Sequence, residues 1–156
     1  MKAITLLAAT MVTFSSCNCQ KTAAEKNNLT SESTMKQEMV PILEYEANTR
    51  GFYNKITAAN QTIAVIKERD GLPTETKISD ADWSELISLY KSVNKEGLST
   101  LKAPSEKRFY DGAAIGSFRV ITKEATFESS AFDAGNPPAE IEKIVNKLIA
   151  IADKQK

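Results

Sequence analysis

The chain has 156 residues, of which 42% are hydrophobic and 26% are charged, and this composition is typical of a single globular domain. Its twenty basic and twenty acidic side chains cancel, which argues against a nucleic-acid partner or a polybasic membrane patch. Histidine, the side chain used most for acid–base catalysis near neutral pH and for binding transition metals, is absent, and we expect neither a metal nor a cofactor.

The first sixteen residues have the features of an export signal. A lysine near the start is followed by an apolar run up to Phe14, which is too short to span a bilayer as a mature helix. The next residues, Ser15, Ser16 and Cys17, resemble the lipobox of bacterial lipoproteins, where small residues precede a cysteine that is diacylated and becomes the mature N-terminus. The resemblance implies a signal peptide over residues 1–16 and lipid on Cys17. Because an aliphatic residue is usual in place of Phe14, an ordinary secretory signal cut near Ser16 is the alternative.

The segment after the signal, residues 17–39, is predicted to be a flexible tether. It is polar and lacks hydrophobic periodicity, so it cannot offset the entropy of its own ordering by burial, although a short helix over residues 31–39 is an alternative. Cys17 and Cys19 are the chain's two cysteines, and two thiolates without further soft ligands are too few for a closed zinc site. We interpret Cys19 as a spare thiol, and we predict a single domain over residues 40–156.

The first half of the domain predicts an antiparallel meander followed by a helix. Residues 42–57 form either one long strand bent at residues 48–51 or two short strands. The turn Arg69-Asp70-Gly71 joins two further β-favouring stretches, residues 62–68 and 74–78. Ser79 then caps a helix over about residues 80–93, with acidic side chains in its first turn, where the helix dipole favours them.

The second half of the domain repeats the order of strands followed by a helix. Residues 113–122 and 125–132 are the fourth and fifth predicted strands. In the break that follows, Gly135 can adopt a positive φ, Asn136 can cap a helix, and Pro137 suits the first helical position. The last helix has the clearest amphipathic pattern of the chain, with one face formed by Ile141, Ile144, Val145, Leu148, Ile151 and Ala152.

The expected order of elements is therefore β-β-β-α-β-β-α. It predicts an α+β domain in which an antiparallel sheet of about five strands carries both helices on one face. Burying four aliphatic side chains of the last helix, at roughly 1.5–3 kcal/mol each, outweighs any contribution from intrinsic helix propensity. The helix consequently needs a sheet to lie on.

Asp111 and Asp133 form a candidate carboxylate pair. Asp111 precedes the fourth predicted strand and Asp133 follows the fifth, and in an antiparallel hairpin these two ends are adjacent. Paired carboxylates at close range are typical of hydrolases. The structural alternative is that Asp111-Gly112 forms a turn and that Asp133 helps to cap the last helix. A calcium site is disfavoured, because no Asp-x-Asp-x-Asp spacing is present.

The segment from Lys107 to Tyr110 joins two cations to two aromatic residues just before a strand. Arg108 and Tyr110 could present a surface to an anionic or sugar ligand. In the alternative, Phe109 or Tyr110 packs under the edge of the sheet, while Lys107 and Arg108 are solvated. Nucleophile elbows and phosphate-binding loops are absent from the sequence, so no residue is assigned a catalytic role.

Five motifs together resemble a group of small exported lipoproteins of unknown function from Bacteroidetes-type bacteria. They are Thr49-Arg50-Gly51-Phe52-Tyr53, Asp80-Ala81-Asp82-Trp83, Leu101-Lys102-Ala103-Pro104-Ser105, Asp111-Gly112-Ala113-Ala114 and Phe132-Asp133-Ala134-Gly135-Asn136-Pro137-Pro138-Ala139-Glu140-Ile141. The resemblance covers about residues 41–152, and its last motif is the most specific. Since the group has no assigned activity, the resemblance implies a lipoprotein and supplies no catalytic residue.

The sequence favours a non-enzymatic binding or interaction module of the cell envelope. We expect lipid on Cys17 to anchor it to the inner or outer membrane, with the domain exposed to the periplasm or the cell surface. Its candidate ligand-binding residues are Arg108, Tyr110, Asp111 and Asp133. A small hydrolase that uses Asp111 and Asp133 is the first alternative, and a secreted enzyme inhibitor is the second.

Overall fold

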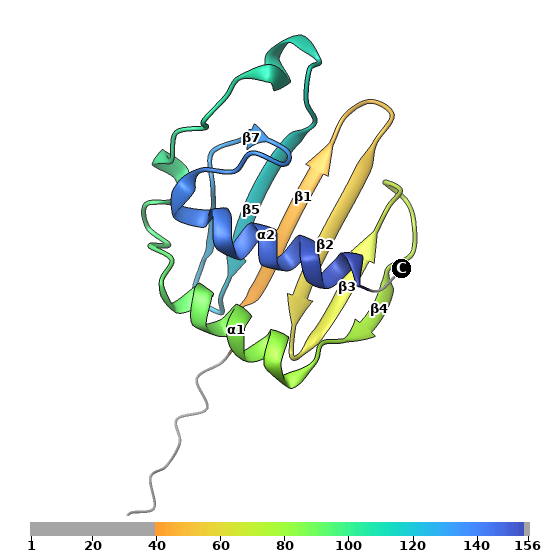
Figure 1. The fold of residues 1–156 in the computed structure, drawn as a ribbon, viewed down its shortest axis with the longest axis vertical. Coiled ribbons are helices and arrows are strands. Elements are labelled where there is room, and N and C mark those ends of the chain that lie inside the picture. The colour runs from red at the N-terminus through yellow and green to blue at the C-terminus, as the bar shows by residue number, and fades with distance from the viewer. Residues whose placement is uncertain (1–39, 155–156) are drawn as a thin grey trace, which may run out of the picture. The chain divides into compact units, whose positions relative to one another are not determined.

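The computed structural model describes residues 40–154, and the predicted signal peptide, the tether, Cys17 and Cys19 lie outside this range (Figure 1). The described part is an α+β domain, as predicted. Its strands, α-helices and short 3₁₀ helices are β1 (Ile42–Asn48), β2 (Tyr53–Ala59), β3 (Thr62–Ile66), β4 (Thr74–Lys77), α1 (Asp80–Lys91), η1 (Leu98–Thr100), η2 (Lys107–Tyr110), β5 (Ile115–Ile121), β6 (Thr126–Glu128), β7 (Phe132–Asp133) and α2 (Ala139–Asp153).

The strands form one antiparallel sheet in the order β4-β3-β2-β1-β5-β6, and β7 pairs with the first residues of β5. Residues 42–57 form two strands, because the N–H of Thr49 donates to the carbonyl of Phe52 at 2.8 Å and closes a turn between them. The alternative of one bent strand is wrong. The predicted strand over residues 125–132 is likewise split, since the chain leaves the sheet where the N–H of Ser130 donates to the carbonyl of Leu98 at 3.2 Å.

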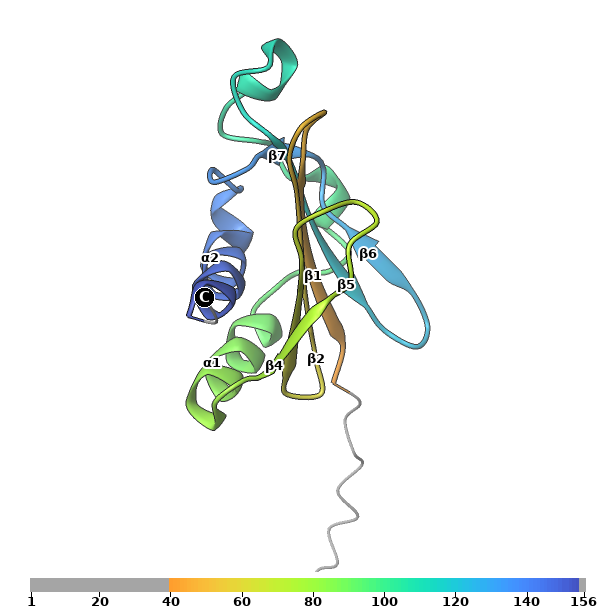
Figure 2. The ribbon, with the colours of Figure 1, turned by 90° about the vertical axis from the view of Figure 1, so that its right-hand side faces the viewer.

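Both helices cover the same face of the sheet, which confirms the predicted layers (Figure 2). Helix α2 lies across β2 and β3 and packs against α1, and its predicted apolar face is buried. The sheet supplies the other half of the core, led by Leu43, Ile56, Ile63, Phe118 and Phe132. None of the described helices is long and apolar enough to cross a membrane.

The opposite face of the sheet carries charge instead of helices. Glu44 of the central strand is only 5% exposed there, because side chains from both neighbouring strands lie over it. Its carboxylate lies 2.7 Å from Nζ of Lys55 on β2 and 2.8 Å from Nη2 of Arg119 on β5. This face is therefore tied across three strands by ion pairs rather than by apolar packing.

Helix α1 begins as predicted, since the hydroxyl of Ser79 accepts the N–H of Asp82 at 3.2 Å. The carboxylate of Asp82 also binds Nζ of Lys147 at 2.9 Å and Nζ of Lys154 at 3.1 Å, and Lys147 pairs with Glu85 as well. Hydrogen bonds from Lys147, Lys154 and Ser79 hold the pKa of Asp82 well below its ordinary value. The two helices are thus joined along their shared border.

Helix α2 begins two residues later than predicted. Its N-cap is Pro138, so Asn136 is not the cap and Pro137 is not the first helical residue. A residue that precedes proline is disfavoured in the helical region, and this excludes Pro137 because Pro138 follows it. Gly135 does adopt the predicted positive φ, at 86°. It lies in a tight turn in which the N–H of Asn136 donates to the carbonyl of Asp133 at 2.8 Å.

Because successive strands are antiparallel, three connections meet at one end of the sheet (Figure 1). They are the β1–β2 turn, the β3–β4 loop, and the segment that contains η2 and leads into β5. We call this the loop end. The described chain enters β1 at Ile42, at the opposite end.

Candidate functional site

The segment around η2 is fixed to the domain by one buried carboxylate. Asp133 is 1% exposed, and its two oxygens accept four hydrogen bonds. Oδ2 accepts from the hydroxyl of Ser105 at 2.6 Å and from the backbone N–H of Lys107 at 2.8 Å. Oδ1 accepts from the backbone N–H of Arg108 at 3.0 Å and from Nη1 of the same arginine at 3.2 Å. Four donors occupy about as many acceptor positions as a carboxylate offers.

These donors keep Asp133 ionised inside the protein. Burial by itself raises the pKa of a carboxyl group. The hydroxyl of Ser105, the two backbone N–H groups and the guanidinium of Arg108 outweigh burial, and together they hold the pKa of Asp133 well below its ordinary value. The side chain of Arg108 is 10% exposed, so this ion pair is largely shielded from water.

The position of Asp133 follows from the sheet rather than from the helix after it. As part of β7 it pairs with Ile115, the first residue of β5, and this pairing carries its side chain to the segment that precedes β5. The prediction that Asp133 helps to cap the last helix is wrong. Its partners lie at residues 105–108, more than twenty positions earlier in the chain.

Asp111 is placed at the end of η2, away from this network. It is exposed and has a φ of 60°, and the N–H of Gly112 donates to the carbonyl of Lys107 at 2.9 Å. The Asp111-Gly112 turn is therefore confirmed. In the described part of the chain, no hydrogen bond joins Asp111 to Asp133. The low pKa of Asp133 is also opposite to the rise that a second carboxylate at close range would cause.

Two aromatic side chains project from the segment that Asp133 fixes. Phe109 is 71% exposed and Tyr110 is 70% exposed, so the alternative in which one of them packs under the sheet edge is wrong. The guanidinium carbon of Arg108 lies 4.3 Å from the centroid of the Phe109 ring. The ring of Tyr110 lies over Gly112, where an added Cβ would be only 3.0 Å from Cε2 of the tyrosine. Of the candidate ligand-binding residues, Tyr110 and Asp111 are thus at the surface, whereas Arg108 is engaged internally.

Most of the exposed large apolar side chains in the described domain lie at the loop end. Besides Phe109 and Tyr110, they include Phe52 in the β1–β2 turn, Leu72 in the β3–β4 loop and Ile115 at the start of β5. Sequence reasoning missed Phe52 and Leu72. The available signal was their position directly after a glycine in a turn, where an apolar side chain has no strand or helix to bury it.

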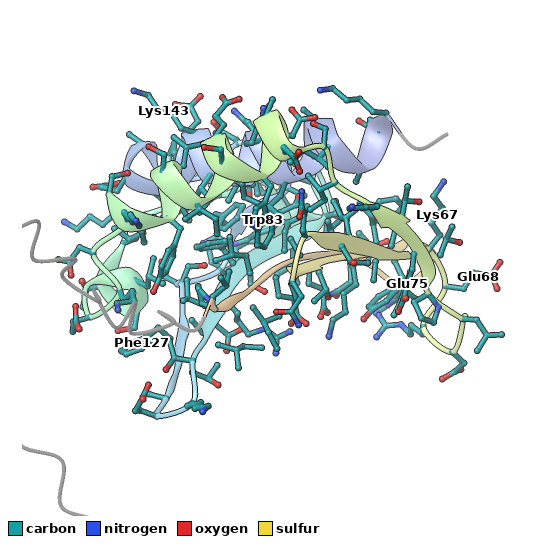
Figure 3. All side chains as sticks on the ribbon, turned by 90° about the horizontal axis from the view of Figure 1, so that it is seen from below. Lys67, Glu68, Glu75, Trp83, Phe127 and Lys143 are labelled. Carbon is teal, nitrogen blue, oxygen red and sulfur yellow. The ribbon has the colours of Figure 1, made fainter. Side chains whose placement is uncertain are left out.

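Two neighbouring hollows lie beside the last turn of α2, with volumes of about 410 and 380 Å³. Leu72 lines the first and Phe52 lines the second, while Val65, Lys67 and Ala152 line both. Figure 3 shows that Lys67 and Glu68 project from this side of the domain. Each hollow has a single acidic side chain in its lining, so neither brings carboxylates together.

The two loops that border these hollows are joined by Arg69. Its Nη2 donates to the carbonyl of Thr49 at 3.1 Å, and its guanidinium carbon lies 5.7 Å from the centroid of the Tyr53 ring. The β3–β4 loop is thereby held against the β1–β2 hairpin. The β3–β4 loop and the β1–β2 hairpin, which border the hollows, are consequently connected to each other.

No family model, curated protein or solved structure matches the chain. Among residues 40–154, no group of three or more cysteine or acidic side chains could hold a metal ion. The fixed aromatic pair lies at the loop end, and the loop end also supplies part of the lining of both hollows beside α2.

Proposed function

We propose that the chain is a non-enzymatic binding module of the cell envelope. Lipid on Cys17 attaches it to a membrane, and Phe109 and Tyr110 contact a partner protein. The observation that carries this proposal is the exposure of two large rings on a segment whose backbone is held by the buried carboxylate of Asp133. Aromatic side chains are enriched in protein interfaces, where a few of them supply much of the binding free energy.

The rigidity of the segment supports a binding role for these rings. Binding costs conformational entropy whenever mobile side chains and loops become ordered. Here Asp133 fixes the backbone of η2, Arg108 stacks on Phe109, and Tyr110 rests on Gly112 before any partner arrives. Preorganised aromatic anchors of this kind contribute contact area at a low entropic cost.

The point at which the tether joins the domain is compatible with binding through the aromatic pair. The N-terminal segment joins the domain at the start of β1, and the aromatic pair lies at the opposite end of the sheet (Figure 1). The predicted tether therefore joins the domain at the end that is remote from Phe109 and Tyr110.

The geometry weighs against the hydrolase alternative. A general base needs an accessible oxygen and a pKa close to the working pH. Asp133 is buried, both of its oxygens are occupied, and its pKa is held low. Asp111 is exposed and lines neither of the two hollows beside the last turn of α2.

A photo-reactive benzophenone amino acid placed at Tyr110 is expected to crosslink the full-length exported protein to a discrete partner in the cells that produce it. The matched control is the same probe at Lys143, which is exposed on the outer side of α2 (Figure 3). Adding Phe109→Ala is expected to lower the yield at position 110 by roughly tenfold or more, the effect of losing a central interface ring. Equal yields from positions 110 and 143, or a yield that Phe109→Ala leaves unchanged, would refute binding through this pair.

The anchoring half of the proposal predicts a change of compartment. Cys17→Ala is expected to move the protein from the membrane fraction to the soluble periplasm or the medium, because the acylated side chain is lost. Cys19→Ala is the control and should leave the protein in the membrane fraction. Fractionation with labelled fatty acid tests both variants, and label incorporated into the Cys17→Ala protein would contradict lipid attachment at Cys17.

A further inference from the structure

Strand β4 is an open edge of the sheet. It pairs only with β3, and it lies at one end of the strand order. Glu75 and Lys77 are exposed on it, and neither side chain has a hydrogen-bond or ion-pair partner within the described part of the chain. An edge strand presents unpaired backbone groups that can pair with another strand.

The register of the hairpin identifies the backbone groups that face outward. The N–H of Ile78 donates to the carbonyl of Gln61 in the β3 direction at 2.9 Å. Alternate residues of an antiparallel strand direct their backbone N–H and C=O groups to the same side. The backbone groups of Thr76 and Thr74 therefore also face β3. Glu75 and Lys77 therefore turn their N–H and C=O groups outward. Pro73 occupies the next outward position and has no N–H to offer.

We propose that β4 pairs with β4 of a second copy of this chain, antiparallel and centred on Thr76. In this register Glu75 of each copy lies opposite Lys77 of the other, and each such pair exchanges two main-chain hydrogen bonds. Both side chains lie on the face of the sheet that carries no helix, because they pair with Ala64 and Thr62 of β3. The two-fold axis thus creates two cross-strand pairs of opposite charge.

The sequence of the edge disfavours the neighbouring symmetric registers. Shifting the axis to Glu75 places two glutamates opposite each other and sets Lys77 against Pro73, which cannot donate. Shifting it to Lys77 places two lysines opposite each other. Charged side chains and proline usually prevent an edge strand from pairing with another strand. Here they disfavour the registers centred on Glu75 and Lys77 and leave the register centred on Thr76.

The short length of β4 sets the strength of this association. A four-residue strand buries much less than the 1,200–2,000 Å² or so that is typical of stable protein interfaces. Leu72, which is 90% exposed just before β4, adds apolar surface beside the edge. Self-association is therefore weak and concentration-dependent.

Charge reversal tests the register. In sedimentation of the full chain over a range of concentrations, Glu75→Lys and Lys77→Glu are each expected to weaken self-association by about tenfold, because both cross-strand pairs become repulsive. The double variant Glu75→Lys/Lys77→Glu restores opposite charges and is expected to associate like the parent. Both positions are exposed, so the single variants should fold as the parent does. Single and double variants that associate equally would overturn the proposal.

Disulfide trapping detects the pairing even when it is weak. The experiment uses a Cys17→Ser/Cys19→Ser chain, into which Thr76→Cys is introduced. The two copies of residue 76 face each other across the axis as a non-hydrogen-bonded pair, with Cα atoms about 4.5 Å apart, a distance that a disulfide can bridge. Glu75→Cys is the control, because its thiols lie on a diagonal of roughly 7–8 Å. We expect a crosslinked dimer from Thr76→Cys at several times the control yield. A parent chain that stays monomeric, with no excess crosslink at position 76, overturns self-pairing and leaves the edge to a strand of a different protein.

Discussion

Replacing Asp133 by asparagine is expected to lower the melting temperature of the domain by roughly 5–15 °C at neutral pH, which is the effect of breaking a buried, fully bonded charge. The amide keeps one acceptor oxygen, but its NH₂ group would face hydrogen-bond donors in either orientation. These donors are the Ser105 hydroxyl and the Lys107 N–H at the position of Oδ2, or the Arg108 N–H and guanidinium at the position of Oδ1. The guanidinium of Arg108 would also lose its anionic partner in a largely buried position, although Nη1 would keep its hydrogen bond to the carbonyl of Ser105. Thermal unfolding of the two proteins measures the difference.

Asp111→Asn is the matched control for this prediction. Asp111 carries the same functional group on the same loop end, but it is exposed and outside the Asp133 network. Its replacement is expected to leave the melting temperature nearly unchanged. An Asp133→Asn protein more stable than the parent would contradict the structural role, because that result follows from relief of repulsion between paired carboxylates. It would also favour the hydrolase alternative.

The sign of the pH dependence checks the same prediction. The pKa of Asp133 is lower in the folded protein than in the unfolded chain, so its ionised form stabilises the fold. This contribution is complete well above pH 4 or so, close to the pKa of an unperturbed aspartate, and it is lost as the pH falls toward the folded-state value. The difference in urea midpoint between parent and Asp133→Asn should therefore be largest near pH 7 and should shrink in acid.

The elements that the sequence predicted correctly depend on residues close together in the chain. The Ser79 cap acts on an N–H three positions away, and the positive φ at Gly135 needs no partner at all. The late start of α2 was also readable, since Pro138 restricts the residue before it. By contrast, the strand predicted over residues 125–132 is interrupted by a hydrogen bond from Ser130 to Leu98, which no local pattern reveals.

The same distinction applies to the candidate site. The sequence identified Tyr110 and Asp133 separately, but it could not show that Asp133 holds the segment from which Tyr110 projects. That relation depends on β7 pairing with the start of β5 and on hydrogen bonds that span at least 25 residues. The sequence also left the exposure of Phe109 and Tyr110 as one of two alternatives, because alternation of side chains does not extend into a 3₁₀ segment before a strand.

Gly116 is the glycine that lies inside a predicted strand, and close packing explains it. It lies in β5, opposite Phe132 of β7, whose ring is fully buried and stacks on Tyr45 with ring centroids 6.4 Å apart. A Cβ added at Gly116 would lie 2.8 Å from Cε2 and 3.1 Å from Cδ2 of that ring, and 3.3 Å from Cα of Ala134. The ring of Phe132 occupies the space that a side chain at position 116 would need.

Gly116→Ala is therefore expected to destabilise the domain by about 1–3 kcal/mol in urea unfolding, the usual cost of overpacking a core. Alanine restricts the unfolded chain more than glycine does, but this gain of about 0.4–1 kcal/mol is smaller than the cost of displacing a buried ring. The control is Gly51→Ala, where an added Cβ meets nothing within 4 Å and φ is not positive, so stability should be unchanged or slightly higher.

A double-mutant cycle with Phe132→Leu then tests whether the ring is the cause. Leucine removes the ring edge that Gly116 faces, so Phe132→Leu should cost less stability in the Gly116→Ala protein than in the parent. If the ring is not the obstacle, the two substitutions will add without coupling, and the cost at position 116 must come from the backbone near Ala134. If the Gly116→Ala protein is as stable as the Gly51→Ala protein, the ring of Phe132 can move away from position 116 without loss of stability. That result would contradict a ring packed between Tyr45 and β5.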